Sequence, residues 1–276
     1  MKNKKTSDDI ISFPDRRAME KMMQVFDESH AQSPLDEAQE LIYQAWESDD
    51  PAERIDLAEQ ALGVSADCAD AWVLLAEEGA VNLAQATEYY QKGVEAGERA
   101  LGEQAFERDK GHFWGLLATR PYMRARLGLA QCLWEKGERE VAIGHYQQML
   151  ELNPNDNQGI RHILLACLLE EKRHDEADAL LAAYADEPSA VWCYSRALLA
   201  YRREGDSDHS RACRKAAIEQ NKFVPAYLAG RRKLPRYLPD YIGIGDKTEA
   251  VAYVFDNRQA WRDTSGAISW LIKANK

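Results

Sequence analysis

Small and apolar residues recur along this chain at a fixed step of 35 residues. The step is close to the period of about 34 residues at which some helix-turn-helix units repeat, and such units stack so as to bury an apolar face that no single unit can bury alone. The repeat therefore predicts an all-α fold built from helical hairpins. The recurring positions are Leu129, Leu164 and Leu199, then Ala142, Ala177 and Ala212, and then Tyr146, Leu181 and Ala216.

The apolar pattern divides the chain into four parts. Residues 1–13 are polar and are expected to be disordered. A helix from Pro14 and divergent helical repeats should follow over 14–110, three clearer repeats over 111–225, and a loop with capping helices over 226–276. The first helices of the clear repeats are expected at about 121–135, 157–172 and 189–203, and their second helices at about 138–152, 175–185 and 208–221.

Charge and hydropathy indicate which partners and which compartment are expected for the chain. Its net charge is −11, and residues 1–110 carry 25 acidic and 11 basic side chains. An acidic surface repels phosphates, so general nucleic-acid binding is not favoured. No apolar run approaches the roughly 18 residues that span a bilayer, and no secretory signal is visible, so the chain is expected to be cytoplasmic and without a membrane partner. The sequence leaves the oligomeric state open.

No residue pattern of known chemistry is found in the sequence. The six histidines and five cysteines lack the spacing of metal sites, and no phosphate-binding or nucleotide-binding glycine motif occurs. We therefore expect no cofactor, no metal and no enzymatic activity. An active site between the C-terminal tail and the helical stack stays open as an alternative.

The first clear repeat has residues at the positions that define a known family. Counted from Met123, it supplies Leu129 at position 7, Ala130 at 8, Ala142 at 20, Tyr146 at 24 and Pro154 at 32. The next unit keeps this pattern but has Ser189 where the proline would be. The stretch resembles the tetratricopeptide repeat (TPR) family. The resemblance implies a right-handed α-solenoid of TPR-like helical hairpins with a helical C-terminal tail.

Two further stretches carry a second resemblance. One is Gly-His-Phe-Trp-Gly with Thr-Arg-Pro-Tyr-Met-Arg in residues 111–124, and the other is Ala-Trp with Ser-Trp-Leu in residues 260–271. They look like a bacterial group of repeat proteins that is loosely similar to the suppression-of-tumorigenicity family. This similarity implies no defined activity.

The TPR resemblance implies that the first helix of each pair lines a concave groove. Grooves of this kind bind extended peptides or helices, and aromatic side chains supply most of the binding energy. The functional hypothesis is a non-catalytic adaptor or scaffold that binds a peptide or partner helix of unknown identity. The expected groove residues are Arg124, Leu127, Gln131, Trp134, His162, Tyr194 and Tyr201.

Two basic segments support an alternative hypothesis. Residues 112–126 interleave aromatic side chains with arginines, a combination that can stack on bases. Residues 231–236 hold a possible anion-binding cluster of Arg231, Arg232, Lys233 and Arg236. A regulator that associates with nucleic acid would use both segments, and its binding would weaken steeply with salt.

Overall fold

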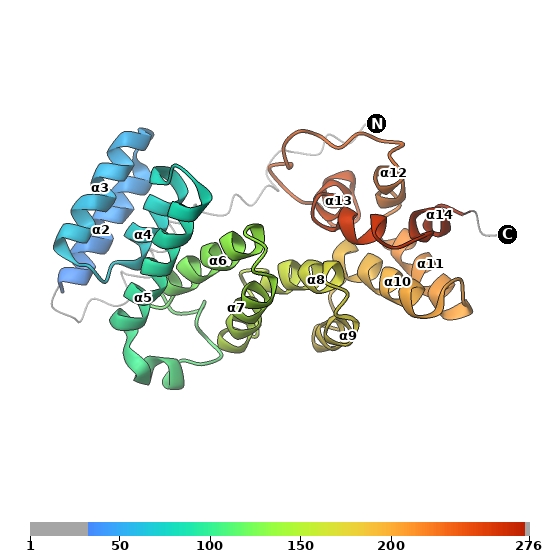
Figure 1. Cartoon of the computed structure of the whole chain (residues 1–276), viewed down its shortest axis with the longest axis horizontal. Helices are drawn as coiled ribbons and strands as arrows, with labels where there is room; N and C mark the ends of the chain where they lie inside the picture. Colours follow the sequence, from blue (N-terminus) through green and yellow to red (C-terminus); the bar gives the residue numbers. More distant parts are fainter. Residues whose placement is uncertain (1–32, 274–276) are drawn as a thin grey trace, which may run out of the picture. The chain divides into compact units, whose positions relative to one another are not determined.

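A computed structural model describes residues 33–273, and every regular element in this range is a helix (Figure 1). The predicted all-α fold is confirmed for these residues. Residues 1–32, with the segment expected to be disordered and the helix expected from Pro14, lie outside the described range. None of the described helices is long and apolar enough to cross a membrane.

The chain divides into two compact units after Gln158. Unit 1 contains α2 (Pro34–Glu47), α3 (Pro51–Val64), α4 (Ala69–Leu74), the π-helical turn η1 (Leu75–Gly79), α5 (Leu83–Arg108), α6 (Arg120–Glu135) and α7 (Arg139–Leu152). Unit 2 contains α8 (Ile160–Glu170), α9 (His174–Ala183), α10 (Ala190–Glu204), α11 (Asp208–Gln220), α12 (Val224–Leu228), α13 (Lys247–Arg262) and α14 (Ala267–Leu271). The division lies inside the stretch 111–225 that was expected to hold three clear repeats.

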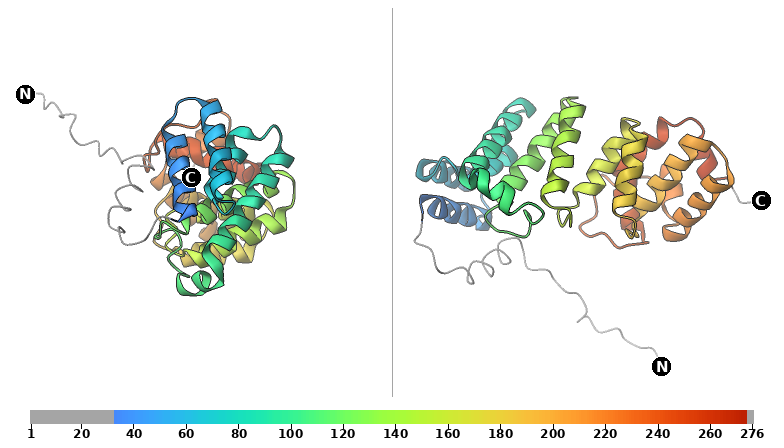
Figure 2. Two further views of the ribbon diagram at one scale, coloured as in Figure 1. Left: turned by 90° about the vertical axis from the view of Figure 1, so that its left-hand side faces the viewer. Right: turned by 90° about the horizontal axis from the view of Figure 1, so that it is seen from below.

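Consecutive helices pack as hairpins within each unit. The pairs α2/α3, α4/α5 and α6/α7 form in unit 1, and α8/α9 and α10/α11 form in unit 2. In Figure 2 the blue-to-green helices of unit 1 lie side by side in such pairs. The six helices expected for the clear repeats are all present, with ends within a few residues of those expected. The right-handed superhelix stays a prediction.

Local sequence explains where the first two helices begin. Ser33 caps α2: its hydroxyl accepts a hydrogen bond from the backbone N–H of Asp36, whose carboxylate accepts one from the N–H of Ser33 in return. Asp50 caps α3 by accepting from the N–H of Ala52 at 2.9 Å. A proline follows each cap, where it costs no hydrogen bond.

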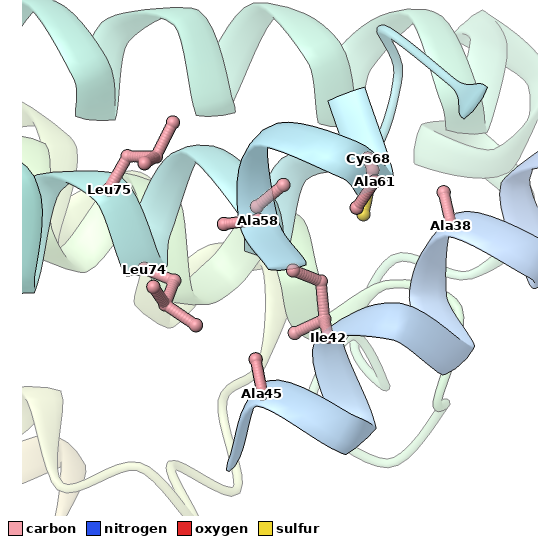
Figure 3. Packing of buried hydrophobic residues seen from close by; sticks show 9 residues of the cluster. Ala38, Ile42, Ala45, Ala58, Ala61, Cys68, Leu74 and Leu75 are labelled. Carbon is pink, nitrogen blue, oxygen red and sulfur yellow. The ribbon is translucent and has the colours of Figure 1, made fainter. Parts of the chain in front are cut away.

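The core of the first hairpin is built mainly from small residues (Figure 3). Of the buried residues that α2 and α3 contribute to this cluster, Ile42 is the large one, and alanines of both helices surround it; the other members come from Cys68 and the helices α4 and η1. Small side chains allow two helices to approach closely. Contact between the two helices therefore fills this core, although few large side chains are present. The buried members of the cluster are Ala38, Ile42, Ala45, Ala58, Ala61, Cys68, Ala71, Leu74 and Leu75.

Glycines bring α5 and α6 into contact. A Cβ atom on Gly128 of α6 would lie 2.1 Å from the ring of Tyr90 on α5, and one on Gly97 would lie 2.9 Å from the Cβ atom of Tyr122. Both positions therefore require the absence of a side chain. Near its C-terminal end α5 is kinked at Gly102, whose φ of 66° lies in the left-handed region.

The predicted C-terminal helices of unit 2 pack against its repeats. α13 contacts α8 and α10, which are the first helices of the two hairpins, as well as α12 and α14. Asp246 caps α13 and accepts from the backbone N–H groups of Thr248 and Glu249. The carboxylate of Glu249 is buried and joins three segments: it accepts from the N–H of Ala190 at 2.8 Å, the N–H of Gly245 at 2.7 Å and the amide of Asn221 at 2.9 Å.

Candidate functional site

Arg124, the first of the expected groove residues, is buried in unit 1. Its guanidinium donates to the carboxylate of Asp70, with Nε 2.7 Å from Oδ1 and a second contact from the terminal nitrogen to Oδ2. Gln39 of α2 donates to the same carboxylate at 3.0 Å, and the guanidinium lies over the ring of Trp46 at 5.3 Å. Arg124 therefore joins the first helices of three hairpins. No local pattern in the sequence marks Asp70 as its partner.

The other arginines of residues 112–126 also face the protein. Arg120 donates from Nε to the carbonyl oxygen of Trp114 at 3.0 Å, and Arg126 donates to His145 and to the hydroxyl of Tyr122. Both guanidinium groups belong to buried residues. Arg120 therefore holds the segment that precedes α6, whereas Arg126 joins α6 to α7. Because both guanidinium groups are engaged inside unit 1, this arrangement does not favour the first basic segment as a surface for nucleic acid.

Three expected groove residues remain accessible on α6. Leu127, Gln131 and Trp134 are three or four residues apart, so they share one face of the helix. Gln131 is exposed, whereas Leu127 and Trp134 are half-buried. The guanidinium of Arg139 lies 3.8 Å from the centre of the Trp134 ring, which holds the indole against the start of α7.

Unit 1 also contains a cavity of about 230 Å³ beside the start of α6. Residues of α2, α5 and α6 line it, mostly with apolar atoms. Two tyrosines, Tyr43 and Tyr122, form part of the wall, and Asp36, Gln39 and Asp67 supply polar groups. Such a cavity can accept an apolar side chain of a partner.

In unit 2 the expected groove residue Tyr194 has no exposed surface. Its ring lies 5.4 Å from that of Tyr253 and 6.5 Å from that of Trp261, both on α13. Its hydroxyl donates to the carbonyl oxygen of Asn221 at 2.5 Å. Helix α13 of the chain itself therefore occupies the place expected for a partner at this residue.

Tyr201 and His162 also contact residues of unit 2. The ring of Tyr201 stacks on that of Trp270 with 4.6 Å between centroids. His162 lies edge-on to Trp192 at 5.4 Å and 3.8 Å from the carboxylate of Glu187. Both residues are half-buried, so each keeps some accessible surface.

Three side chains in unit 2 lie in contact in the order cysteine, histidine and carboxylate, as in a thiol catalytic triad. Cys213 Sγ lies 3.6 Å from His209 Nε2, and His209 Nδ1 lies 2.9 Å from Glu204 Oε1, beside a cavity of about 320 Å³. Burial raises the pKa of the Cys213 thiol, and the charge of Glu204 raises it further. The His209 side chain is 64% exposed. A thiol that stays protonated beside a solvated imidazole is a weak nucleophile, and the geometry favours a hydrogen-bond network at the surface.

The expected anion-binding residues lie between α12 and α13. Arg231, Arg232, Lys233 and Arg236 are all exposed. The guanidinium of Arg236 lies 5.3 Å from the ring centre of its neighbour Tyr237. Within residues 33–273, no group of three or more histidine, cysteine, aspartate or glutamate side chains is placed to hold a metal ion.

Among solved structures the chain is similar to YrrB, described as a TPR protein with an unusual peptide-binding site. The two are 19% identical, the match covers 71% of this chain and 90% of YrrB, and the TM-score is 0.47. A structural similarity this low does not identify any binding residue in this chain.

Similar sequences are found among animal proteins. The suppressor of tumorigenicity 7 protein-like of Rattus norvegicus is 31% identical over 253 residues, which is 84% of this chain and 45% of the rat protein. The human protein of the same name is 30% identical, with 84% and 44% covered. The ST7 homolog of Drosophila melanogaster is 27% identical over 260 residues, 85% of this chain and 48% of the fly protein. The chain thus spans somewhat less than half the length of these relatives.

These relatives correct one expectation and confirm another. A bacterial group was expected from residues 111–124 and 260–271, but the relatives come from animals. The similarity to suppression-of-tumorigenicity proteins is confirmed, because the family model described as ST7 protein matches residues 3–274. The chain belongs to the ST7 protein family.

Proposed function

We propose that this protein is an interaction scaffold that binds a peptide or a partner helix along α6 of unit 1. The observation that carries the proposal is the accessible face of Leu127, Gln131 and Trp134, whose spacing suits an amphipathic segment. Trp134 combines a large apolar surface with a fixed position against Arg139. A tryptophan held in this way is the kind of side chain that contributes about 2 kcal/mol or more to an interface.

Unit 2 is a weaker candidate for the same role. Tyr194 and Tyr201, its aromatic residues at the expected groove positions, contact α13 and α14 or the residues just before α14. A partner at Tyr194 would have to displace α13, and would thereby expose Tyr253 and Trp261, which are fully buried. Burial of such rings opposes that displacement.

Selection from a peptide library tests the proposal. Peptides selected on the wild-type protein are measured against Leu127→Glu/Gln131→Glu/Trp134→Ala, with circular dichroism to confirm that the variant folds. We expect affinities to fall about tenfold or more, which corresponds to 1.4 kcal/mol or more. Val141→Ser on α7, an exposed apolar residue of the same unit, is the control and should keep full affinity. Selected peptides that bind the triple variant and the control equally well would contradict the proposal.

A further inference from the structure

The loop between α12 and α13 exposes an unusual amount of apolar surface. Ten large hydrophobic side chains are exposed in the described part of the chain, and five of them lie in one stretch of this loop, residues 237–244. Their exposed fractions are 71% for Tyr237, 48% for Leu238, 70% for Tyr241, 61% for Ile242 and 69% for Ile244. Soluble surfaces carry such residues singly, and a cluster indicates a place where another surface docks.

Cations surround this apolar segment. Arg231, Arg232, Lys233 and Arg236 precede it in the loop and are exposed. The fold adds two more: Lys222 and Lys247 lie 5.5 and 5.7 Å from the ring centre of Phe223, and Arg232 lies 5.8 Å from the same centre. Residues 221–249 hold six basic and three acidic side chains, in a chain whose net charge is −11.

The fold fixes both ends of the loop. At the start, the N–H of Arg232 donates to the carbonyl oxygen of Ala226 at 3.1 Å. At the end, the N–H of Gly243 donates to the hydroxyl of Thr248 at 2.9 Å, and the N–H of Gly245 donates to Glu249. Figure 1 shows the segment as a wide arc from α12 to α13. Because its ends are held, the loop presents its apolar side chains at a defined place on unit 2.

We propose that this loop, residues 231–244, docks unit 2 onto an anionic lipid bilayer surface. Tyr237, Tyr241, Ile242 and Ile244 would enter the headgroup region, where tyrosine rings are favoured. The neighbouring cations would contact lipid phosphates, whose negative surface potential attracts them. Docking of this kind needs exposed side chains and no spanning helix, so it is compatible with the lack of a spanning helix in residues 33–273.

The chemistry of the loop favours a bilayer over other anionic partners. Ile242 and Ile244 have no ring with which to stack on a base, so they do not suit single-stranded nucleic acid. A folded acidic protein would need a cavity shaped to accept the protruding side chains. A bilayer accepts them without a fixed shape.

Vesicle sedimentation tests the proposal with the full chain. We expect the wild-type protein to sediment with vesicles of phosphatidylcholine and phosphatidylglycerol, and to stay in solution with phosphatidylcholine alone. Arg231→Glu/Arg232→Glu/Lys233→Glu should lower the partition coefficient by about tenfold or more, because each cation contributes near the surface. Tyr241→Ser/Ile242→Ser/Ile244→Ser should lower it as well, although it keeps every charge.

Matched controls separate the loop from the remaining surface. Val81→Ser/Val141→Ser removes exposed apolar side chains elsewhere, and Lys110→Glu/Lys215→Glu reverses exposed cations elsewhere. Both should sediment like the wild type. The proposal is overturned if the wild type does not bind anionic vesicles, if the controls lose as much binding as the loop variants, or if the apolar loop variant binds fully. Release by inorganic phosphate at unchanged ionic strength would identify a site for a free anion and would also overturn it.

Discussion

The guanidinium of Arg124 on α6 holds the carboxylate of Asp70 on α4, with Nε 2.7 Å from Oδ1 across 54 positions of the chain. Asp70 has no exposed surface and Arg124 has little. A residue that the TPR resemblance places in a partner-binding groove thus has an internal role, because it joins α6 to α4 and also lies over Trp46 of α2. The accessible part of the proposed groove begins three residues later, at Leu127.

Removal of Arg124 should destabilise unit 1. Arg124→Leu leaves the Asp70 carboxylate buried without its cation, which typically costs about 3–5 kcal/mol. Asp70→Asn/Arg124→Leu removes the charge as well and should recover a large part of this loss, since the amide can still accept from Gln39. Urea denaturation of the wild type, the single variants and the double variant measures the coupling. Additive losses would show that the pair makes no joint contribution.

The close contact between Gly128 on α6 and Tyr90 on α5 should make stability sensitive to a side chain at position 128. Gly128→Ala would place a methyl group 2.1 Å from the Tyr90 ring, so the ring or the helices must shift and stability should fall by about 1–3 kcal/mol. Gly144→Ala on α7 is the matched control. Apart from its chain neighbours and the backbone of its own helix, no atom lies within 4 Å of the new methyl group, and a helical alanine is about 0.5–1 kcal/mol more favourable than glycine. Thermal unfolding should therefore shift in opposite directions for the two variants.

The carboxylate of Glu249 should anchor the end of the loop at residues 231–244 to the rest of unit 2. Glu249→Ala leaves the N–H groups of Ala190 and Gly245 without their acceptor, at about 1–3 kcal/mol for the buried Ala190 donor and less for the half-buried Gly245. Amide hydrogen exchange at these two residues should become faster, while Glu249→Gln, which keeps an acceptor oxygen, should change it less. Unchanged exchange in the alanine variant would contradict the anchoring role.

Stability should fall in mild acid because of His145. Burial and the neighbouring Arg126 lower the pKa of this histidine from 6.5 to about 4, so the folded protein keeps it neutral while the unfolded chain takes up a proton. Its contribution to the free energy of unfolding is complete above pH 6.5 and declines as the pH falls toward 4. By linkage the loss at pH 5 is about 1–2 kcal/mol.

His145→Gln should remove this part of the pH dependence. Urea denaturation of the wild type and the variant at pH 7 and pH 5 isolates the contribution, because other groups titrate in both proteins. Equal pH dependence in the two would show that His145 is protonated alike in the folded and unfolded states.

Local signals in the sequence account for most of the helices. Residues such as Ser33 with Pro34, Asp50 with Pro51, and Asp246 act within one helical turn, so their roles follow from neighbours in the chain. The 35-residue repeat likewise predicted the paired helices of α6 to α11, because each hairpin contains its own apolar pattern.

Long-range contacts could not be predicted in the same way. Asp70 lies 54 residues from Arg124, and Glu249 lies 59 residues from Ala190. No local pattern marks either pair. The burial of Tyr194 depends on α13, which follows it by more than fifty residues, so a residue expected on an open groove is covered by the chain itself.

Site-specific photocrosslinking tests the proposed scaffold most directly. A photoreactive amino acid replaces Gln131 on the accessible face of α6, and in a second protein it replaces Val141 on α7 as the control. After illumination in cells that produce the protein, we predict a discrete crosslinked species from position 131 that disappears when Trp134→Ala is added, and none from position 141. The same products from both positions, or products at 131 that persist without the tryptophan ring, would contradict binding along α6.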